Sequence, residues 1–541
     1  MKHKFANSVT LIIVLLAGMA SHAQVTYTDL YEFDDPHGCC VTYPGLLAQG
    51  RDGYLYGGTF SEGKYGYGTA FRMALDGGLT TLHDFDSTDG NGVQGGLSMG
   101  LDGNFYGTTY QGGAHHFGTI FQIKPDGTFT TLYNFGNTND GAYPKTPPVP
   151  AADGNLYGVT GNGTVPVAYR ITTAGKFTPI ATLPSQSYSP LVLGANGLLY
   201  GMTEYGGDFN KGTAFTLSTK GVLKVIHSFD GAHGAQPLSP LLQWSDGNFY
   251  GTTSNGGPQS GGVVFRLSPS GTYTVLHAFQ AGDTVNGYDP TAGLVTGRDF
   301  EHGSNLYGLN SLGGALGDGT AFRLKFDGSS YSLLYTFDRN NGGSNPSATP
   351  IAHTNGTIYG ITQHGGQSDD GVFYGMNAGT FEFASLFAVT SGKIGATVQI
   401  LGQGFTGAKS VMFFGASANF KVVSDNFLTA TVPDGAVTGP VRIIRANGDS
   451  LYTVQNFYVT PQILNFSPPS GPVGTVVTIT GKSLADTLGV GFGNRKPAQF
   501  TVNSDGQVTA TVPAGAQTGP IGIQTEGGIV AISSSKFTVT K

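Results

Sequence analysis

Charge is scarce in this sequence. Asp, Glu, Lys and Arg together make up 11% of the 541 residues, against about 25% in ordinary soluble proteins. The net charge is −7, and no run of basic residues follows the first few positions. These observations argue against nucleic acid and anionic membrane surfaces as partners, because both are recognised by clustered Lys and Arg.

Long apolar runs are also missing after the N-terminal segment. Residues 1–23 contain Lys2 and Lys4, an apolar run from Val9 to Ala20, and small residues at Ser21 and Ala23. This order is typical of a secretory signal peptide, and the run is too short to span a bilayer. We therefore expect cleavage near Ala23 and a mature chain that is secreted or at the cell surface, with no membrane insertion.

Cysteine is almost absent. The only two cysteines, Cys39 and Cys40, are adjacent, and thiols rarely stay free in an oxidising compartment. A disulfide between neighbours is strained relative to ordinary geometry, so we predict a vicinal disulfide in the first loop and leave two free thiols as the alternative. The adjacent pair His115-His116 has no carboxylate or cysteine near it, so no metal site and no cofactor are predicted.

Glycine, in contrast, is abundant, with 87 residues that recur at fixed places. A Tyr-Gly pair returns at intervals between 43 residues (Tyr157 to Tyr200) and 57 residues (Tyr250 to Tyr307). Each copy contains four short segments rich in aromatic and β-branched residues, separated by turn signals such as Asp102-Gly103. The tyrosines of the seven copies are Tyr56, Tyr106, Tyr157, Tyr200, Tyr250, Tyr307 and Tyr359.

Four antiparallel strands in each of seven copies, with almost no helical periodicity, predict an all-β fold that begins with a seven-bladed β-propeller. A β-solenoid or a string of small sheets is the alternative. The glycine after each tyrosine is expected to let an aromatic ring from a neighbouring blade approach the backbone. TYTDLYEF at Thr26 to Phe33 resembles the closing strand of each copy and is expected to complete the seventh blade. The alternative is that TFEFASLF closes that blade.

The pattern changes after residue 380. SGKIGATVQILGQGF from Ser391 is echoed by SGPVGTVVTITGKSL from Ser470. Alternating strands and Gly-Pro turns in both copies predict two immunoglobulin-like β-sandwiches. The expected organisation is a signal peptide at 1–23, the propeller at 24–381, and the two immunoglobulin-like domains at 382–460 and 461–541.

Two resemblances accompany these patterns. The repeat, with its GTxF core (Gly118 to Phe121 in the second copy), resembles the GloVer-type tandem-repeat proteins, which are exported by bacteria. The two C-terminal copies resemble IPT/TIG immunoglobulin-like domains. The resemblance implies an extracellular setting, and it implies no particular activity.

The candidate binding residues lie in the blade-to-blade loops. In a propeller these loops share a face with the loops between second and third strands, whereas the tight first and third hairpins share the other face. Tyrosines there would stack on sugar rings and amides would bond hydroxyl groups, around the mouth of the central channel. The alternative is that the tyrosines wedge between blades and touch no ligand. The residues are Tyr43, Gln94, Tyr143, Tyr188, Gln236, Tyr288 and Asn345.

The function predicted from these features is non-enzymatic binding or adhesion. The partner is expected to be an extracellular polysaccharide or a cell-surface component, bound by a monomer. Glycosidases use paired carboxylates, but Glu is rare, and only Glu62 and Glu204 fall in loops where a site could lie. No catalytic residue is therefore predicted. A polysaccharide-active hydrolase or lyase, and a purely structural envelope protein, are the alternatives.

Overall fold

The computed structural model describes residues 25–41, 45–161, 163–299 and 304–541. The expected signal peptide and Tyr43 lie outside these residues. The described chain consists of β-strands joined by turns, with two short 3-10 helices, η1 (Asp35–His37) and η2 (Glu526–Gly528). No helix in this part of the chain is long and apolar enough to cross a membrane.

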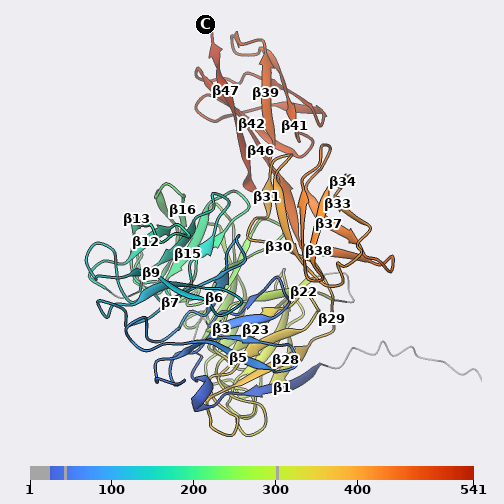
Figure 1. The fold of residues 1–541 in the computed structure, drawn as a ribbon. Coiled ribbons are helices and arrows are strands. Elements are labelled where there is room, and N and C mark those ends of the chain that lie inside the picture. Colours follow the sequence, from blue (N-terminus) through green and yellow to red (C-terminus); the bar gives the residue numbers. More distant parts are fainter. Residues whose placement is uncertain (1–24, 42–44, 162, 300–303) are drawn as a thin grey trace, which may run out of the picture.

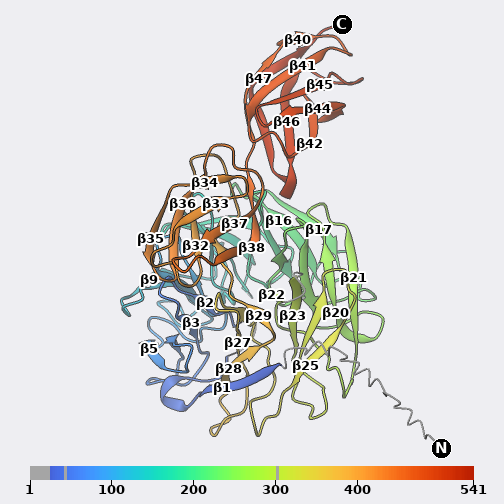
Figure 2. The same ribbon diagram turned by 90° about the vertical axis from the view of Figure 1, so that its right-hand side faces the viewer.

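Seven sheets form the blades of a β-propeller (Figures 1 and 2), which confirms the predicted fold class. Within each of the first six blades, four strands that follow one another in sequence pair antiparallel. The strands of blades 1 to 4 are β2 (Ala48–Gln49), β3 (Leu55–Gly58), β4 (Thr69–Met73) and β5 (Leu79–Asp84); β6 (Leu97–Met99), β7 (Phe105–Thr109), β8 (Thr119–Ile123) and β9 (Phe129–Asn134); β10 (Val149–Pro150), β11 (Leu156–Val159), β12 (Val167–Ile171) and β13 (Phe177–Thr182); and β14 (Val192–Leu193), β15 (Leu199–Thr203), β16 (Thr213–Leu217) and β17 (Leu223–Ser228).

The remaining blades follow the same order, with additions at the end of the ring. Blade 6 gains a fifth strand, β29, which pairs with its innermost strand β22, and blade 7 takes its fourth strand from elsewhere in the chain. The strands are β18 (Leu242–Gln243), β19 (Phe249–Thr253), β20 (Ser260–Leu267) and β21 (Tyr273–Gln280); β22 (Val295–Asp299), β23 (Ser304–Asn310), β24 (Thr320–Lys325), β25 (Ser332–Thr336) and β29 (Thr380–Phe381); and β26 (Ile351–Ala352), β27 (Ile358–Ile361) and β28 (Val372–Asn377).

The fourth strand of blade 7 is β1 (Thr26–Glu32), at the start of the described chain. It pairs antiparallel with β28, from Thr26 opposite Asn377 to Glu32 opposite Val372. The predicted closure is thus confirmed. The competing segment TFEFASLF is divided between two sheets, because Thr380–Phe381 joins blade 6 and Ser385–Phe387 enters the next domain.

The Tyr-Gly pair is explained by two contacts inside one blade. The Tyr106 hydroxyl donates a hydrogen bond to Asp102 Oδ2 (2.8 Å), so the tyrosine fastens the turn of its own hairpin. A Cβ on Gly107 would lie 2.4 Å from Cζ of Phe121, which is the cross-strand partner of Gly107. The prediction that the glycine admits a ring from a neighbouring blade was wrong. The GTxF phenylalanine of the same blade fills that space, because it stands directly opposite on the adjacent strand.

Neighbouring blades are joined at their outer edge by stacked rings. His83 on β5 lies flat against Phe129 on β9, with centroids 3.8 Å apart, and His277 on β21 lies flat against Tyr331 of blade 6, at 4.3 Å. Tyr133 on β9 stacks in the same way on Phe177 of β13, at 4.0 Å. These histidines therefore serve packing, since tyrosine replaces them at the same place in the repeat.

The C-terminal region forms two β-sandwiches of identical topology. Each sandwich consists of a four-stranded sheet and a five-stranded sheet. The sheet orders are β30-β32-β36-β35 with β31-β38-β37-β33-β34, and β39-β41-β45-β44 with β40-β47-β46-β42-β43. The strands are β30 (Ser385–Phe387), β31 (Ser391–Gly392), β32 (Thr397–Leu401), β33 (Ser410–Phe413), β34 (Ala416–Ala418), β35 (Phe420–Ser424), β36 (Phe427–Thr431), β37 (Gly439–Ile444), β38 (Ser450–Val459), β39 (Gln462–Ser467), β40 (Ser470–Gly471), β41 (Val476–Lys482), β42 (Thr487–Phe492), β43 (Lys496–Ala498), β44 (Phe500–Ser504), β45 (Gln507–Thr511), β46 (Gly519–Thr525) and β47 (Val530–Val539).

The first sandwich rests on the tight-turn face of the propeller (Figure 2). Its side chains bond to the first hairpins of blades on opposite sides of the ring, so the domain crosses the propeller axis. The bonds run from Ser424 to the Arg51 carbonyl (2.7 Å), Gln399 to the Leu101 carbonyl (3.0 Å), Ser391 to the Ala195 carbonyl (2.6 Å), Tyr458 to the Ser245 carbonyl (2.9 Å) and Gln403 to the Thr354 hydroxyl (2.8 Å).

Candidate ligand-binding face

The opposite face carries the longer loops, and it lies at the end of the molecule away from the sandwiches. A recurring backbone hydrogen bond ties six of the blade-to-blade loops to the end of a second strand. The Tyr110 amide donates to the Gly92 carbonyl (2.8 Å) and the Gln363 amide to the Asn345 carbonyl (3.1 Å). This bond defines one equivalent position in six loops, occupied by Gly92, Tyr143, Gln186, Gln236, Asp289 and Asn345.

Three of the predicted site residues share this position. Tyr143, Gln236 and Asn345 all have a left-handed backbone, with φ of 53°, 54° and 53°. Gln94 and Tyr188 come two residues after it, whereas Tyr288 comes one residue before it. The predicted residues, Tyr43 apart, thus occupy three levels of the loop rather than one ring. The tyrosines do not mark equivalent backbone positions, because the loops place them before, at or after the hydrogen-bonded residue.

Aromatic side chains gather over blades 1 to 3. The Tyr143 ring is 5.4 Å from that of Tyr110 and 5.6 Å from that of Phe117, and Tyr110 is 6.3 Å from Phe60. Tyr143 therefore packs against other rings, as the alternative interpretation expected, yet Phe60, Tyr110 and Tyr143 all remain partly exposed. We call Phe60, Tyr110, Tyr143 and the half-buried Tyr188 the aromatic arc.

Lys145 lies inside the aromatic arc. It is only 5% exposed, and its Nζ stands 3.4 Å from the ring centroid of Tyr188 and 5.4 Å from that of Tyr110. Burial lowers the pKa of the Lys145 ammonium to about 8, and the carboxylate of Glu204 opposes this shift only in part. Across the described residues its Nζ has no hydrogen-bond acceptor and no ion-pair partner.

The other side of the face, over blades 4 to 7, is lined by amides and a carboxyl group. Gln236 donates to the Tyr205 hydroxyl (3.0 Å), and Asn345 donates to Gln363 Oε1 (2.8 Å). Asp289, at the backbone position equivalent to that of Tyr143, accepts a hydrogen bond from the Ser311 hydroxyl (3.0 Å), and burial raises its pKa. These groups are held in place by local bonds and offer donors and acceptors to a ligand.

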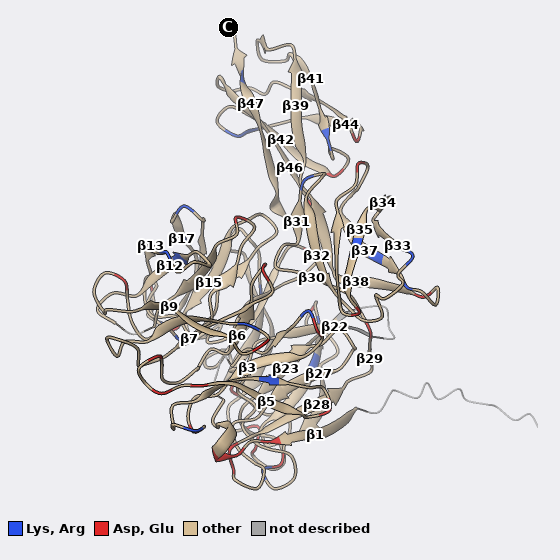
Figure 3. Cartoon of the chain, in the orientation of Figure 1, with Lys and Arg blue, Asp and Glu red and all other residues tan. Residues whose placement is uncertain are grey.

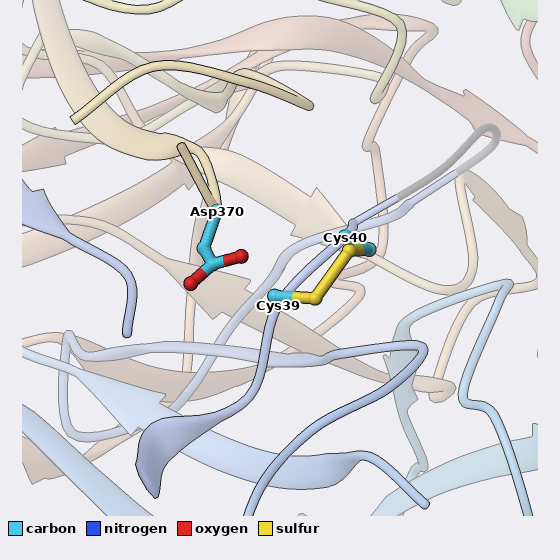
Figure 4. A group of neighbouring side chains, drawn as sticks. All are labelled: Cys39, Cys40 and Asp370. Carbon is cyan, nitrogen blue, oxygen red and sulfur yellow. A yellow bond between two sulfur atoms is a disulfide. The ribbon is translucent and has the colours of Figure 1, made fainter. Parts of the chain in front are cut away.

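Cys39 and Cys40 are joined by a disulfide in the structure (Figure 4). Cys39 forms an isolated β-bridge with Ser61, as Tyr288 does with Leu312 in a later loop. The disulfide therefore belongs to the loop that enters blade 1. The side chain of Asp370 approaches both sulfurs, and burial raises the pKa of this carboxyl. Because each sulfur is bonded to the other, neither is a thiolate ligand, and one carboxylate alone makes no metal site.

Sequence reasoning missed Phe60, Tyr110 and Lys145. Phe60, Tyr110 and Glu204 end the segments GGTF, GTTY and GMTE, which occupy one column of the repeat. That column faces the same mouth as the blade-to-blade loops. Comparing it across the copies would have revealed the first two residues. No sequence feature pointed to Lys145, because the residues next to it in the chain do not predict that a lysine is buried there.

The architecture is that of a seven-bladed β-propeller followed by immunoglobulin-like domains. Residues 19–188 and 186–418 match the model of the Gloeobacter/Verrucomicrobia repeat, and residues 461–540 match that of the IPT/TIG domain. The chain therefore belongs to the Gloeobacter/Verrucomicrobia repeat family. This confirms the resemblance stated from the sequence. No curated protein matches the chain.

Several solved structures share parts of the fold at low similarity. The surface glycan-binding protein PbSGBP-B from Prevotella bryantii is 21% identical over 27% of this chain and 38% of its own, with a TM-score of 0.22. A fungal alcohol oxidase of the AA5 family is 13% identical over 95% of this chain and 99% of its own, with a TM-score of 0.40. A chain of the mitotic checkpoint complex is 11% identical over 69% and 97%, with a TM-score of 0.43. None of these likenesses carries a functional argument.

Proposed function

We propose that this chain is an exported, non-enzymatic carbohydrate-binding protein whose ligand site is the loop face of the propeller. The observation that carries the proposal is the aromatic arc, which leaves Phe60, Tyr110 and Tyr143 partly exposed on the face opposite the sandwiches. Aromatic rings provide flat apolar surface at small entropic cost. Such a surface suits the apolar face of a sugar ring.

The amide side of the face supports the same ligand class. Gln236 and Asn345 are already oriented by Tyr205 and Gln363, which limits the entropy lost when a sugar hydroxyl binds. A binding site of rigid apolar surface and a few placed polar groups is the usual form of a small-ligand site. Asp289, a carboxyl group of this face, is already the hydrogen-bond partner of Ser311.

The proposal is tested by a binding screen of residues 24–541 against glycans and cell-wall fractions. A double variant, Tyr110→Ala with Tyr143→Ala, should weaken binding to any ligand found by about tenfold or more. Tyr54→Ala is the control, because Tyr54 is 37% exposed in a hairpin on the tight-turn face. Equal losses of affinity in the double variant and in Tyr54→Ala would show that the loop face is not the binding site. If the purified protein cleaves a polysaccharide, the proposal of non-enzymatic binding is wrong and the protein is an enzyme.

A further inference from the structure

Lys145 is buried, and among the residues that the structure describes its ammonium group has no hydrogen-bond or ion-pair partner. Lysine is almost never fully buried unless it is paired, and an unpaired buried ammonium is costly. The tyrosine rings that surround Lys145 recover part of that cost through their negative faces. No carboxylate of the described residues completes the contact within ion-pair distance. A charged side chain that is buried at a cost in stability, and that packing still holds in one position, is a candidate ligand-binding residue.

The surroundings of Lys145 differ from those of the equivalent positions. Gly161 stands where other copies carry Phe60, Tyr110 or Glu204, and a Cβ there would lie 3.3 Å from Lys145 Cγ and 2.3 Å from the Tyr143 carbonyl oxygen. The column of side chains around the mouth is therefore interrupted beside Lys145. The same loop level carries Gln94 in the preceding loop and Tyr188 in the following one, both partly exposed.

We propose that Lys145 binds the carboxylate of an acidic sugar residue while the aromatic arc holds the sugar ring. The inference rests on the proposed function and narrows its ligand to polysaccharides that contain uronic acids. A carboxylate supplies the negative partner that the Lys145 ammonium lacks among the described residues, and a charge-assisted bond made away from water is stronger than one at the surface. Tyr188 and Tyr110, which flank Nζ, provide stacking surface next to that carboxylate.

Acidic side chains in the loops of this face limit how much negative charge the ligand can carry. Asp and Glu gather in the loops around β1 and η1, at the end farthest from the C-terminus (Figure 3). A polymer with a carboxylate on every residue would be repelled by these loops at low ionic strength. One acidic residue at the arc, with neutral residues extending over the amide side, fits the charges of the face better. Affinity for a fully acidic polymer should therefore rise with salt.

The test uses residues 24–541 and calorimetric titration with neutral oligosaccharides that carry a single galacturonate, glucuronate or mannuronate residue, each against its methyl ester. The ester keeps the sugar and removes the charge. For at least one pair, the acid should bind ten times more tightly than the ester at pH 7. Lys145→Met should abolish this preference. The control, Lys211→Met, should keep it, because Lys211 is an exposed lysine on the same face.

A second measurement needs no variant. The preference of the wild-type chain for the acid over the ester should decline as the pH rises above about 8, because the Lys145 ammonium then loses its proton. Acid and ester binding equally, equal effects of Lys145→Met and Lys211→Met, or a preference unchanged up to pH 10 would each overturn the inference and leave the proposed function standing. If neither these sugars nor any neutral glycan or cell-wall fraction binds, the proposed function fails as well.

Discussion

The ring of Tyr27 lies flat against the ring of Tyr335, with centroids 4.1 Å apart and planes 5° from parallel. Tyr27 is on β1 and Tyr335 is on β25 of blade 6, so the contact joins the N-terminal strand to blade 6. It repeats the stack of His83 on Phe129 between blades 1 and 2. The N-terminal strand thus takes part in both the sheet of blade 7 and the packing between blades.

Replacing Tyr27 should weaken this closure. Tyr27→Ala removes the stack on Tyr335 and a contact at 5.2 Å with Tyr374, and we expect a loss of about 2–4 kcal/mol in the free energy of unfolding of the propeller. Urea titration followed by the fluorescence of Trp244, the only tryptophan and one packed on Phe326 in the propeller, measures the change.

Tyr65→Ala is the control for this substitution, because Tyr65 is 50% exposed in a loop of blade 1. It should change stability by no more than about 0.5 kcal/mol. Deletion of residues 24–34 should have a larger effect than either variant. An unchanged unfolding curve after that deletion would mean that the ring does not need its N-terminal strand.

The glycine after each tyrosine gives a second prediction. Gly107→Ala would bring a methyl group to 2.4 Å from Phe121 Cζ, and the buried ring has little room to move. We expect a loss of about 1–3 kcal/mol from overpacking. Gly78→Ala, in a turn of blade 1 where the nearest atom would be 3.5 Å away, is the control. Equal stability of the two variants in urea would contradict the packing described here.

Burial of Lys145 has a consequence for stability. Its folded-state pKa of about 8 is below the ordinary value of 10.5, so the unfolded chain binds more protons between these two pH values. The contribution of this group to the free energy of unfolding is therefore unfavourable at pH 7 and becomes less so as the pH rises from 8 to 10.5.

Lys145→Met should accordingly raise the melting temperature at pH 7 by about 1–3 °C. The gain should shrink at pH 9.5, where the wild-type lysine is mostly neutral. Differential scanning calorimetry of both chains at the two pH values checks this. A variant that melts below the wild type at pH 7 would show that the Lys145 ammonium stabilises the fold. The interpretation that the protein gives up stability to keep a ligand-binding group would then be wrong.

The disulfide of Cys39 and Cys40 can be checked by chemical modification. Intact-mass analysis after alkylation under denaturing conditions should give no adduct without reductant and two adducts after reduction. Alkylation of both thiols in the unreduced protein would exclude the bridge. Chain recovered from culture medium rather than from cytoplasmic expression is required, because the cytoplasm keeps thiols reduced.

The repeat made most of the fold predictable. Turn glycines at fixed spacing and the match of TYTDLYEF to the closing strands were sufficient to predict seven blades and their closure by β1, because strand patterns and turn chemistry are local. The ring that fills the space at Gly107 was assigned to the wrong blade, since a pattern in one strand does not say from which side its partner approaches.

The site was less predictable. Tyr143, Gln236 and Asn345 occupy one equivalent backbone position, whereas Gln94, Tyr188 and Tyr288 do not. Loop register depends on backbone hydrogen bonds that the side chains do not encode. The burial of Lys145 and the docking of the first sandwich depend on contacts between residues far apart in the sequence. Nothing near Ser391 or Tyr458 in the chain indicates that they bond to Ala195 and Ser245.

The docking of the first sandwich across the propeller axis also limits how the proposed carbohydrate ligand could lie on the propeller. A ring open at both ends could be threaded by a linear chain and could travel along it. Here the bonds from Ser424 to blade 1 and from Tyr458 to blade 5 place a domain over the face opposite the loops. Under the proposed function, the loop face would therefore bind a chain end, a side branch or a surface segment of the polymer.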